Sequence, residues 1–233
     1  MEKLLLNSIQ TKGIFDQNAQ ILLDNIRELY VSILLEDQEF AEAHEVEQFL
    51  WRLHHKRIEE FRAQIRKSLS VSNNANVSMP PVGDKKIARR DPNQKILAIF
   101  RNFLSEATGF YHDLILKIRA KHGLPQDDLT SNVIETKVTK DEKSIKRCQL
   151  SCHRCLIYLG DLARYKEIHG DSHGEGDAKN HDWSIAAGFY VKSASIWPAN
   201  GNPHNQVLTF FSFVFLEHLS HFNSKTAVHL QAY

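Results

Sequence analysis

The sequence from residue 148 to residue 165 reads CQLSCHRCLIYLGDLARY, and this stretch decides the fold class. Its apolar positions recur at alternating spacings of four and three residues, which is the period of one face of an α-helix; they are Cys148, Cys152, Cys155, Leu159 and Leu162. The pattern predicts a helix over residues 141–168 that packs this face into a core.

A second helix is expected to pack closely on the first, because the two together resemble the tetratricopeptide pattern. Leu159-Gly160 matches the L-G of the first helix of such a hairpin, and the second helix follows the pattern at Ala186, Tyr190 and Pro198. Gly160 lets the helices approach, and Tyr190 fills the space between them. Because one hairpin cannot bury its apolar face alone, we expect it to stack on the helices before it.

Helical spacing of apolar residues continues along the rest of the chain, and no segment predicts a strand. The strongest candidate spans residues 92–122, with Asp91 before Pro92 at its start and Gly123 at its end, which are start and stop signals of a helix. The other candidates are residues 16–36, 43–67 and 183–197, and more weakly 2–10. These segments predict an all-α protein, an antiparallel array of helices that forms one domain over residues 1–206.

Three segments between the predicted helices are polar or rich in Gly and Pro, and we interpret them as loops. They span residues 70–91, 123–140 and 169–182. The last reads HGDSHGEGDAKNHD, and its histidines make a metal-binding tract the alternative interpretation. A solvated insertion is the simpler interpretation, because no ordered scaffold would fix the ligands.

Two interpretations are open for the three cysteines, which are the only ones in the chain. Cys148, Cys152 and Cys155 lie on one helical stripe, whereas structural zinc sites usually draw their ligands from turns and from a second ligand pair elsewhere. We therefore predict core packing and no metal site. An odd, clustered set of cysteines is also not a disulfide framework, which favours a reducing compartment.

The composition and the absence of motifs argue against several classes of protein. Lys and Arg number 29 against 28 Asp and Glu, so the overall charge gives no argument for binding nucleic acid or a membrane. The longest apolar run, residues 207–216, is too short to span a bilayer, and we expect no signal peptide. No nucleophile motif or phosphate-binding glycine loop is present, so we expect no enzymatic activity and no cofactor.

With these features in place, the sequence resembles the Est/Smg family of telomerase-associated and nonsense-mediated mRNA decay proteins. The resemblance rests on residues 152–165 (CHRCLIYLGDLARY), on residues 46–51 (VEQFLW) followed by Lys56, and on residues 186–206, which end in WPANGNPHNQ. It covers about residues 14–206. It implies a 14-3-3-like domain with tetratricopeptide-type hairpins, which binds phosphoserine or phosphothreonine segments of the Upf-type decay helicase.

The resemblance also implies where the phosphate would bind. The 14-3-3 proteins carry G-D-x-x-R-Y in the equivalent helix, and residues 160–165 (GDLARY) reproduce this pattern. Arg164 and Tyr165 are therefore the expected phosphate ligands on this helix. The family's other phosphate-binding cation falls on Lys56.

One phosphate contact of the 14-3-3 proteins is missing from the sequence. A further arginine of those proteins falls on Ala63, so Arg57 or Arg62 would have to substitute for it. A phosphoryl group carries about −1.5 to −2 charges near neutral pH, which suits paired Arg and Lys side chains. Without the resemblance, Lys56 and Arg164 would be interpreted as ordinary surface cations whose stems lie along apolar surface.

The resemblance stops after Gln206. Residues 207–233 form a divergent tail rich in Phe and His, so we expect a shortened product whose tail is poorly integrated with the helices. The expected partners are a phosphorylated Upf-type RNA helicase and a homologous 14-3-3-like domain, in the cytoplasm, in processing bodies and in part in the nucleus; no membrane and no direct nucleic-acid binding is expected. Two rivals stay open: a phosphate-independent scaffold for dimerisation, and a telomerase-associated nucleic-acid binder.

Overall fold

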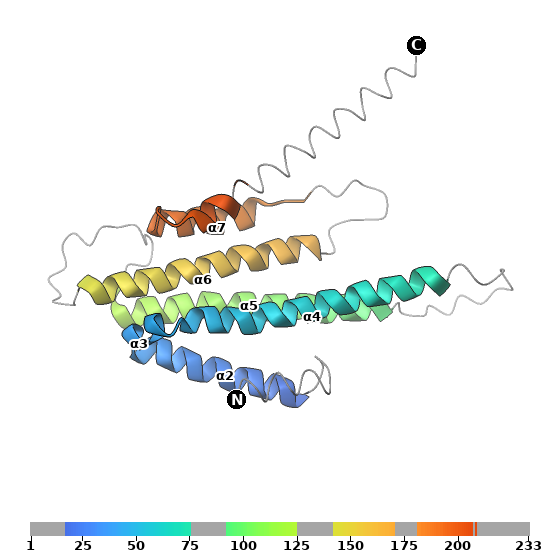
Figure 1. The fold of residues 1–233 in the computed structure, drawn as a ribbon, viewed down its shortest axis with the longest axis horizontal. Coiled ribbons are helices and arrows are strands. Elements are labelled where there is room, and N and C mark those ends of the chain that lie inside the picture. Colours follow the sequence, from blue (N-terminus) through green and yellow to red (C-terminus); the bar gives the residue numbers. More distant parts are fainter. Residues whose placement is uncertain (1–16, 76–91, 125–141, 171–180, 207, 209–233) are drawn as a thin grey trace, which may run out of the picture.

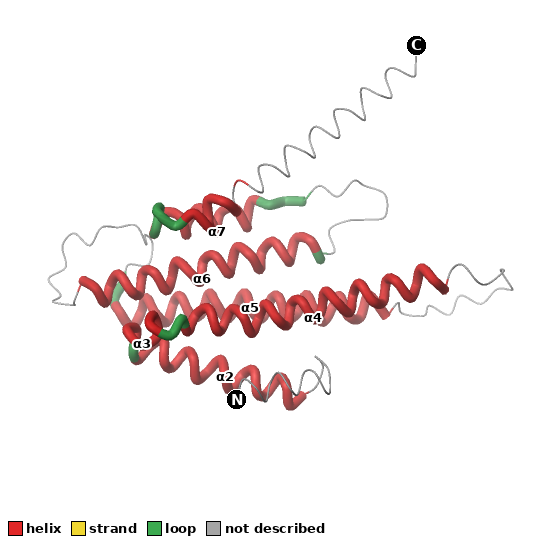
Figure 2. Tube along the Cα trace, in the orientation of Figure 1, coloured by secondary structure: helices red, strands yellow, loops and turns green. Residues whose placement is uncertain are grey.

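The computed structural model describes residues 17–75, 92–124, 142–170, 181–206 and 208, and this part of the chain is built from helices (Figures 1 and 2). The helices are α2 (Gln17–Glu36), α3 (Gln38–Ala43), α4 (Val46–Ala75), α5 (Pro92–His122), α6 (Glu142–Ile168) and α7 (Ser184–Ile196). No strand occurs in these ranges, so the all-α prediction is confirmed. The predicted helix over residues 2–10, most of the three predicted loops and nearly all of the tail lie outside the described residues.

The predicted start of one helix at residue 43 is wrong, because the chain forms two helices there. The carboxylate of Asp37 accepts a hydrogen bond from the N–H of Phe40 at 2.9 Å and so begins the short helix α3. Glu45 then adopts a φ of 51°, in the left-handed region, which interrupts the helix before α4 begins at Val46. A residue other than glycine seldom takes this conformation, so the spacing of apolar residues gives no sign of the break.

The predicted loop over residues 70–91 begins too early, because α4 continues to Ala75. The hydroxyl groups of Ser68 and Ser70 donate hydrogen bonds to the carbonyl oxygens of Ile65 and Lys67, at 2.9 and 2.7 Å. These bonds give each hydroxyl group an acceptor within the helix itself, so the two serines do not end it. Residues 46–75 contain no Gly or Pro that would end the helix earlier.

The helices form an array in which α5 packs against α4 and α6, α6 packs against α7, and α2 covers α4 and α5 from the other side (Figure 1). Aromatic side chains fill the centre: the rings of Phe61 and Phe100 lie 5.0 Å apart, and Tyr111 is fully buried between α4 and α6. This packing fixes α4 beside α6 and so brings His55 and Arg62 of α4 next to Tyr165 of α6.

The three cysteines are fully buried, so the prediction that they pack in the core is confirmed. Burial raises the pKa of Cys152 to about 12 and that of Cys155 well above its ordinary value. Among the described residues no group of three or more His, Cys, Asp or Glu side chains is placed to hold a metal ion. The thiols are therefore protonated and inaccessible at neutral pH, which makes them poor nucleophiles.

We expect no cysteine of the folded protein to react with a thiol-specific chromogenic reagent at pH 8, and all three to react after unfolding in guanidinium chloride. The absorbance of the released reagent measures the number of reactive thiols in each state. Rapid modification of a thiol in the folded protein, or one zinc ion per chain that is lost in Cys152→Ala, would contradict the structural role.

The close approach of α6 and α7 at Gly160 is also confirmed. A Cβ atom on Gly160 would lie only 2.6 Å from Cε1 and 2.7 Å from Cζ of the Tyr190 ring, distances that real Cβ contacts do not reach. Tyr190 itself is completely buried. Glycine at this position therefore allows the aromatic ring to lie directly on the backbone of α6.

We expect Gly160→Ala to lower the free energy of unfolding by about 1–3 kcal/mol, because the added methyl group overpacks a filled space. Gly188→Ala is the matched control, since a Cβ on this helical glycine would meet nothing within 4 Å. The control should be neutral or more stable by up to about 1 kcal/mol, because alanine favours the helix. Urea denaturation measures both, and equal stability of Gly160→Ala and the unsubstituted protein would refute the close packing.

Candidate phosphate-binding site

Helices α4 and α6 lie next to each other and run in the same direction, so residues far apart in sequence meet. The rings of Trp51 and Tyr158 stack at 4.8 Å with only 3° between their planes. Further along both helices, the hydroxyl oxygen of Tyr165 lies 3.4 Å from Nε2 of His55, 110 residues away. The side chains around this second contact form what we call the α4–α6 surface; they are the partly exposed His55, Lys56, Glu59, Arg62, Asp161 and Arg164 and the buried Tyr165.

Arg164 is the residue of this surface with the most unused hydrogen-bonding capacity. Its side chain is about one-third exposed, and the guanidinium carbon lies 5.3 Å from the centre of the Tyr165 ring. One terminal nitrogen donates a long hydrogen bond of 3.5 Å to the carboxylate of Asp161. Nε is buried and has no hydrogen-bond partner. The guanidinium group is thus held in place while part of its donor set stays unfilled.

Asp161 connects Arg164 to α7. Its carboxylate accepts a hydrogen bond of 2.6 Å from the hydroxyl of Tyr190, the same side chain that lies on Gly160. Burial raises the pKa of Asp161, and the hydrogen bond from Tyr190 and the charge of Arg164 oppose that rise. Because Tyr190 fixes Asp161, the packing of α7 on α6 also fixes the position of Arg164.

Arg62 contributes a second guanidinium group to the site. Its side chain lies over the ring of Tyr165, 5.6 Å from the ring centre, and pairs with Glu59 at 2.6 Å. Glu59 also lies 3.9 Å from Nε2 of His55. The structure therefore places Arg62 beside Tyr165. A residue that substitutes for the arginine missing at position 63 would have to lie there.

Tyr165 is almost fully buried, and its hydroxyl group lies beside the partly exposed ring of His55. Burial raises the pKa of this phenol, while Arg164 and Arg62 oppose the rise. The hydroxyl group stays protonated at neutral pH and can donate a hydrogen bond to an anion.

Lys56 lies on α4 next to His55, about 100° further around the helix. It is half-buried and makes no hydrogen bond or ion pair with any described residue. Its charge acts on the neighbouring carboxyl of Glu60, whose pKa is raised by burial and lowered in turn by Arg57 and Lys56. The structure thus does not join Lys56 to Arg164 directly, and an anion between them would have to bridge the two cations.

Arg57 does not belong to this surface. It is only 6% exposed and lies on the opposite side of α4, about 200° from His55. There it lines a cavity of about 770 Å³ between α2, α4 and α5, together with Arg27 and Phe61. The suggestion that Arg57 replaces the missing 14-3-3 arginine does not fit this placement, because its side chain points away from Arg164 and Tyr165.

Taken together, the α4–α6 surface is suited to binding an anion. Lys56, Arg62 and Arg164 supply three positive charges, while its two carboxylates are occupied, Glu59 by Arg62 and Asp161 by Tyr190 and Arg164. The sequence pattern does not indicate that His55, Asp161 and Tyr190 support the site. His55 could have been found from its spacing, because Trp51, His55 and Arg62 share one helical face.

Residues 45–170 match the protein family described as Telomerase activating protein Est1. The matched residues include α4, α5 and α6 and therefore every charged residue of the α4–α6 surface. The chain belongs to the Est1 family. The resemblance to the Est/Smg proteins predicted from residues 152–165 is thereby confirmed, and the α4–α6 surface lies within the part of the chain that matches the family.

Family members with curated names are similar to this chain over most of its length. The nonsense-mediated mRNA decay factor SMG7 of Arabidopsis thaliana is 40% identical over 225 residues, which cover 88% of this chain. The SMG7-like decay factor of the same plant is 31% identical over 92% of the chain, and the telomerase-binding protein EST1A of Danio rerio is 26% identical over 77%. This Est1-family chain spans about one-fifth of the length of the two plant relatives.

None of the helices described for this Est1-family chain is both long and apolar enough to cross a membrane. The names of these relatives describe decay factors and a telomerase-binding protein, and none of them names an enzyme.

Proposed function

We propose that this chain is a phosphoserine- and phosphothreonine-dependent binding domain of the nonsense-mediated mRNA decay machinery. Its similarity to SMG7, SMG7-like and SMG5 proteins, all named as decay factors, supports a role in this process. The observation that carries the phosphate-binding part is the state of Arg164, whose guanidinium group is held by Asp161 and Tyr165 while about one-third of its side chain stays exposed.

A phosphoryl group fits the donors of the α4–α6 surface. It brings about −1.5 to −2 charges and three oxygen acceptors, and Arg binds such groups through paired N–H donors. Arg164 and the hydroxyl of Tyr165 approach it from α6, and Lys56 and Arg62 approach it from α4. A carboxylate carries one charge and two oxygens, so it would leave more of these donors unfilled and bind more weakly.

The partner in this proposal is a phosphorylated segment of the Upf-type RNA helicase, bound in the cytoplasm and in processing bodies, with a smaller nuclear fraction. A homologous 14-3-3-like domain is a second partner. Three large apolar side chains of α2 and α3 support it, since Ile21, Leu29 and Phe40 are between 44 and 51% exposed. None of the three belongs to the α4–α6 surface, so the proposal allows both partners to bind at once.

The test is a calorimetric titration with peptides of one helicase segment, phosphorylated or not on a single serine, at two salt concentrations. We expect measurable affinity for the phosphopeptide and at least tenfold weaker binding of its unphosphorylated form, because the hydrogen bonds to the charged group are lost. Equal binding of the two peptides would favour the phosphate-independent scaffold. Tight binding of an oligonucleotide with a steep salt dependence would favour the nucleic-acid binder.

A further inference from the structure

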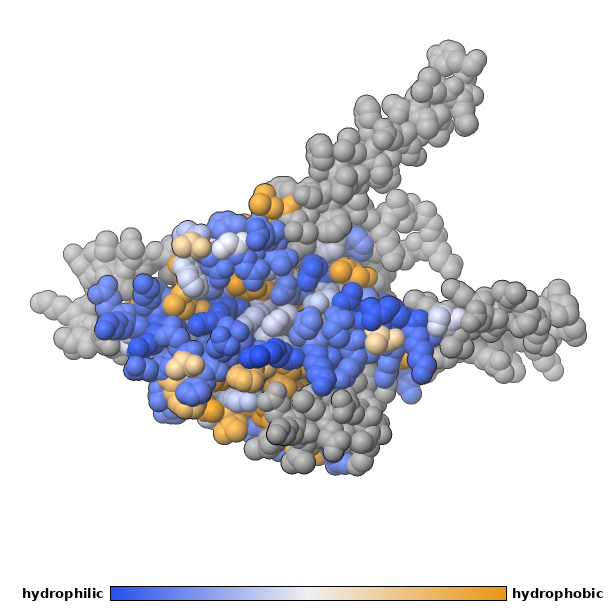
Figure 3. Space-filling view, in the orientation of Figure 1, coloured by the Kyte–Doolittle hydropathy of each residue, from blue (hydrophilic) through white to orange (hydrophobic). Residues whose placement is uncertain are grey.

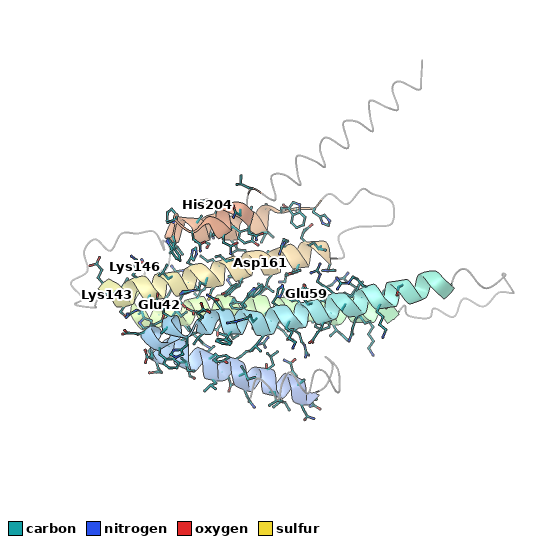
Figure 4. The ribbon with its side chains drawn as sticks, viewed as in Figure 1. Glu42, Glu59, Lys143, Lys146, Asp161 and His204 are labelled. Carbon is teal, nitrogen blue, oxygen red and sulfur yellow. The ribbon has the colours of Figure 1, made fainter. Side chains whose placement is uncertain are left out.

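The hydrophilic surface of α6 continues from Arg164 toward the N-terminal end of the helix. Figure 3 shows mainly hydrophilic residues over α4 and α6 on the face turned to the viewer, and Figure 4 labels Lys146 and Asp161 at the two ends of this stretch of α6. Between them lies Arg154, ten residues before Arg164. The two arginines occupy the same side of the helix array, since Arg154 reaches Glu47 of α4 and Arg164 lies beside Tyr165, which also contacts α4.

Arg154 is held at the surface without filling its hydrogen-bonding capacity. Its side chain is 20% exposed, and its nearest acidic partner is Oε1 of Glu47 at 3.8 Å, which is an ion pair but too long for a hydrogen bond. No hydrogen bond joins Arg154 to any other residue in the described part of the chain. Glu47 is 1% exposed and balances the charge of Arg154 from the interior of the protein. Because the two groups do not form a hydrogen bond, the N–H donors of the guanidinium group stay available.

The electrostatic surroundings of Arg154 favour an anion. Lys146 lies two helical turns earlier on α6, is exposed, and makes no ion pair with any described residue. Arg147, in contrast, is bound by Glu39 and Glu42 of α3 and is not available. Lys146 is therefore a cation near Arg154 that no described carboxylate pairs, while the charge of Arg154 itself is balanced by Glu47.

The spacing of the two arginines sets the length of a ligand that could contact both. Ten residues of α-helix rise about 15 Å, and an extended peptide advances about 3.3 Å per residue. An extended segment bound along α6 would therefore bring a second side chain to Arg154 four or five residues away from the phosphorylated residue at Arg164.

We propose that Arg154 is a second anion subsite of the same surface, which binds a carboxylate or phosphoryl side chain four or five residues from the phosphoserine or phosphothreonine. This inference rests on the proposed function and narrows it from any phosphorylated segment to one with a second negative charge at a fixed spacing. Planar guanidinium groups suit this role, because they bind carboxylate and phosphoryl oxygens with paired hydrogen bonds.

The experiment is a set of phosphopeptides with one phosphoserine and otherwise neutral residues, in which alanine at −5, −4, +4 or +5, or at the control positions −2 or +2, is replaced by aspartate or by a second phosphoserine. Binding to the full chain is measured by fluorescence anisotropy at constant salt. We expect about fivefold to tenfold tighter binding for the second anion on one side of the phosphoserine at four or five residues, and no gain at ±2. Comparing the aspartate and phosphoserine arms identifies which anion the subsite takes.

The assignment to Arg154 is tested with Arg154→Gln, which should remove the gain from the second anion and keep the dependence on the first phosphate. Because this change leaves Glu47 buried without its cation, the double variant Glu47→Gln/Arg154→Gln is measured as well, and its melting temperature shows that it folds. Lys192→Gln, an exposed lysine on α7, is the control and should keep the gain.

The outcomes separate the subsite from the function it rests on. If the unsubstituted protein ignores phosphorylation altogether, the proposed function fails and the subsite with it. If it requires the phosphoserine but gains nothing from a second anion at any of the four spacings, or keeps the gain in both Arg154 variants, the subsite alone is refuted.

Discussion

We expect Arg164→Glu and Lys56→Glu each to abolish the binding of a phosphopeptide. Each hydrogen bond to a charged group is worth about 1.5–3 kcal/mol, so the loss of one cation weakens binding by about tenfold to a hundredfold, and a carboxylate in its place repels the phosphate as well. The measurement is the calorimetric titration described above, made on each variant. Circular dichroism should show unchanged helical content.

The controls for this prediction exclude a loss of folding. Arg164→Glu brings a second carboxylate next to Asp161, so Arg164→Gln is measured beside it and should keep the melting temperature while still losing at least tenfold in affinity. Lys192→Glu, exposed on α7, should bind as the unsubstituted protein does. If both charge reversals bind the phosphopeptide at full strength, the phosphate does not bind at the α4–α6 surface, and the scaffold becomes the better description.

We expect the stability of the protein to decrease on acidification because of His54. This side chain is fully buried in α4, where its Nε2 accepts hydrogen bonds from Arg27 of α2 at 2.8 and 3.1 Å. Its Nδ1 therefore carries the proton and donates to the carbonyl oxygen of Leu50 at 2.8 Å, with the hydroxyl of Tyr111 3.1 Å away. Burial, and then the charge of Arg27, lowers the pKa of His54 to about 3.

The sign of the effect follows from proton binding. The unfolded chain has a histidine pKa of about 6.5, so between about pH 6.5 and pH 3 the unfolded state binds the proton that the folded state excludes. Stability is then fully present above pH 6.5 and falls by up to about 1.4 kcal/mol per pH unit below it. The buried His153, whose pKa is also lowered by burial, acts in the same direction.

Urea denaturation at pH 7.5 and 5.5 isolates the contribution of His54 when the unsubstituted protein is compared with His54→Gln. Glutamine can still accept a hydrogen bond from Arg27 but cannot be protonated, so the variant should lose about 1.4 kcal/mol less between the two pH values. The same pH dependence in both proteins would show that His54 is not held neutral in the folded state.

Much of the fold could be predicted from the spacing of apolar residues. The features that could not be predicted depend on the conformation of single residues. The stripe from Cys148 to Leu162 and the signals around Pro92 and Gly123 locate α6 and α5 almost to the residue. The break before α4 could not be predicted, because it depends on the left-handed backbone of Glu45, which has no signature in composition.

The site was predictable in part, for a similar reason. The G-D-x-x-R-Y pattern identifies Arg164 and Tyr165, but how far Lys56 lies from them depends on the rotation of α4, which the contact of Trp51 with Tyr158 fixes. The position of Arg57 could have been predicted from the sequence. Arg57 precedes the buried Phe61 by four residues, so both side chains lie on the core-facing side of α4. The hydrogen bond from Tyr190 to Asp161 needs a third helix, and no local pattern reports it.

The central claim is that the donors of Arg164 receive the phosphoryl group, and the signal of its Nε–H in a proton–nitrogen correlation spectrum tests this most directly. Arg164→Lys assigns the signal by removing it. Because a phosphate held by the guanidinium group changes the surroundings of its Nε–H, a bound phosphate should shift the signal and slow its exchange with water. We expect this change with the phosphopeptide and not with the unphosphorylated peptide; an Arg164 signal unchanged at saturating phosphopeptide would contradict the account.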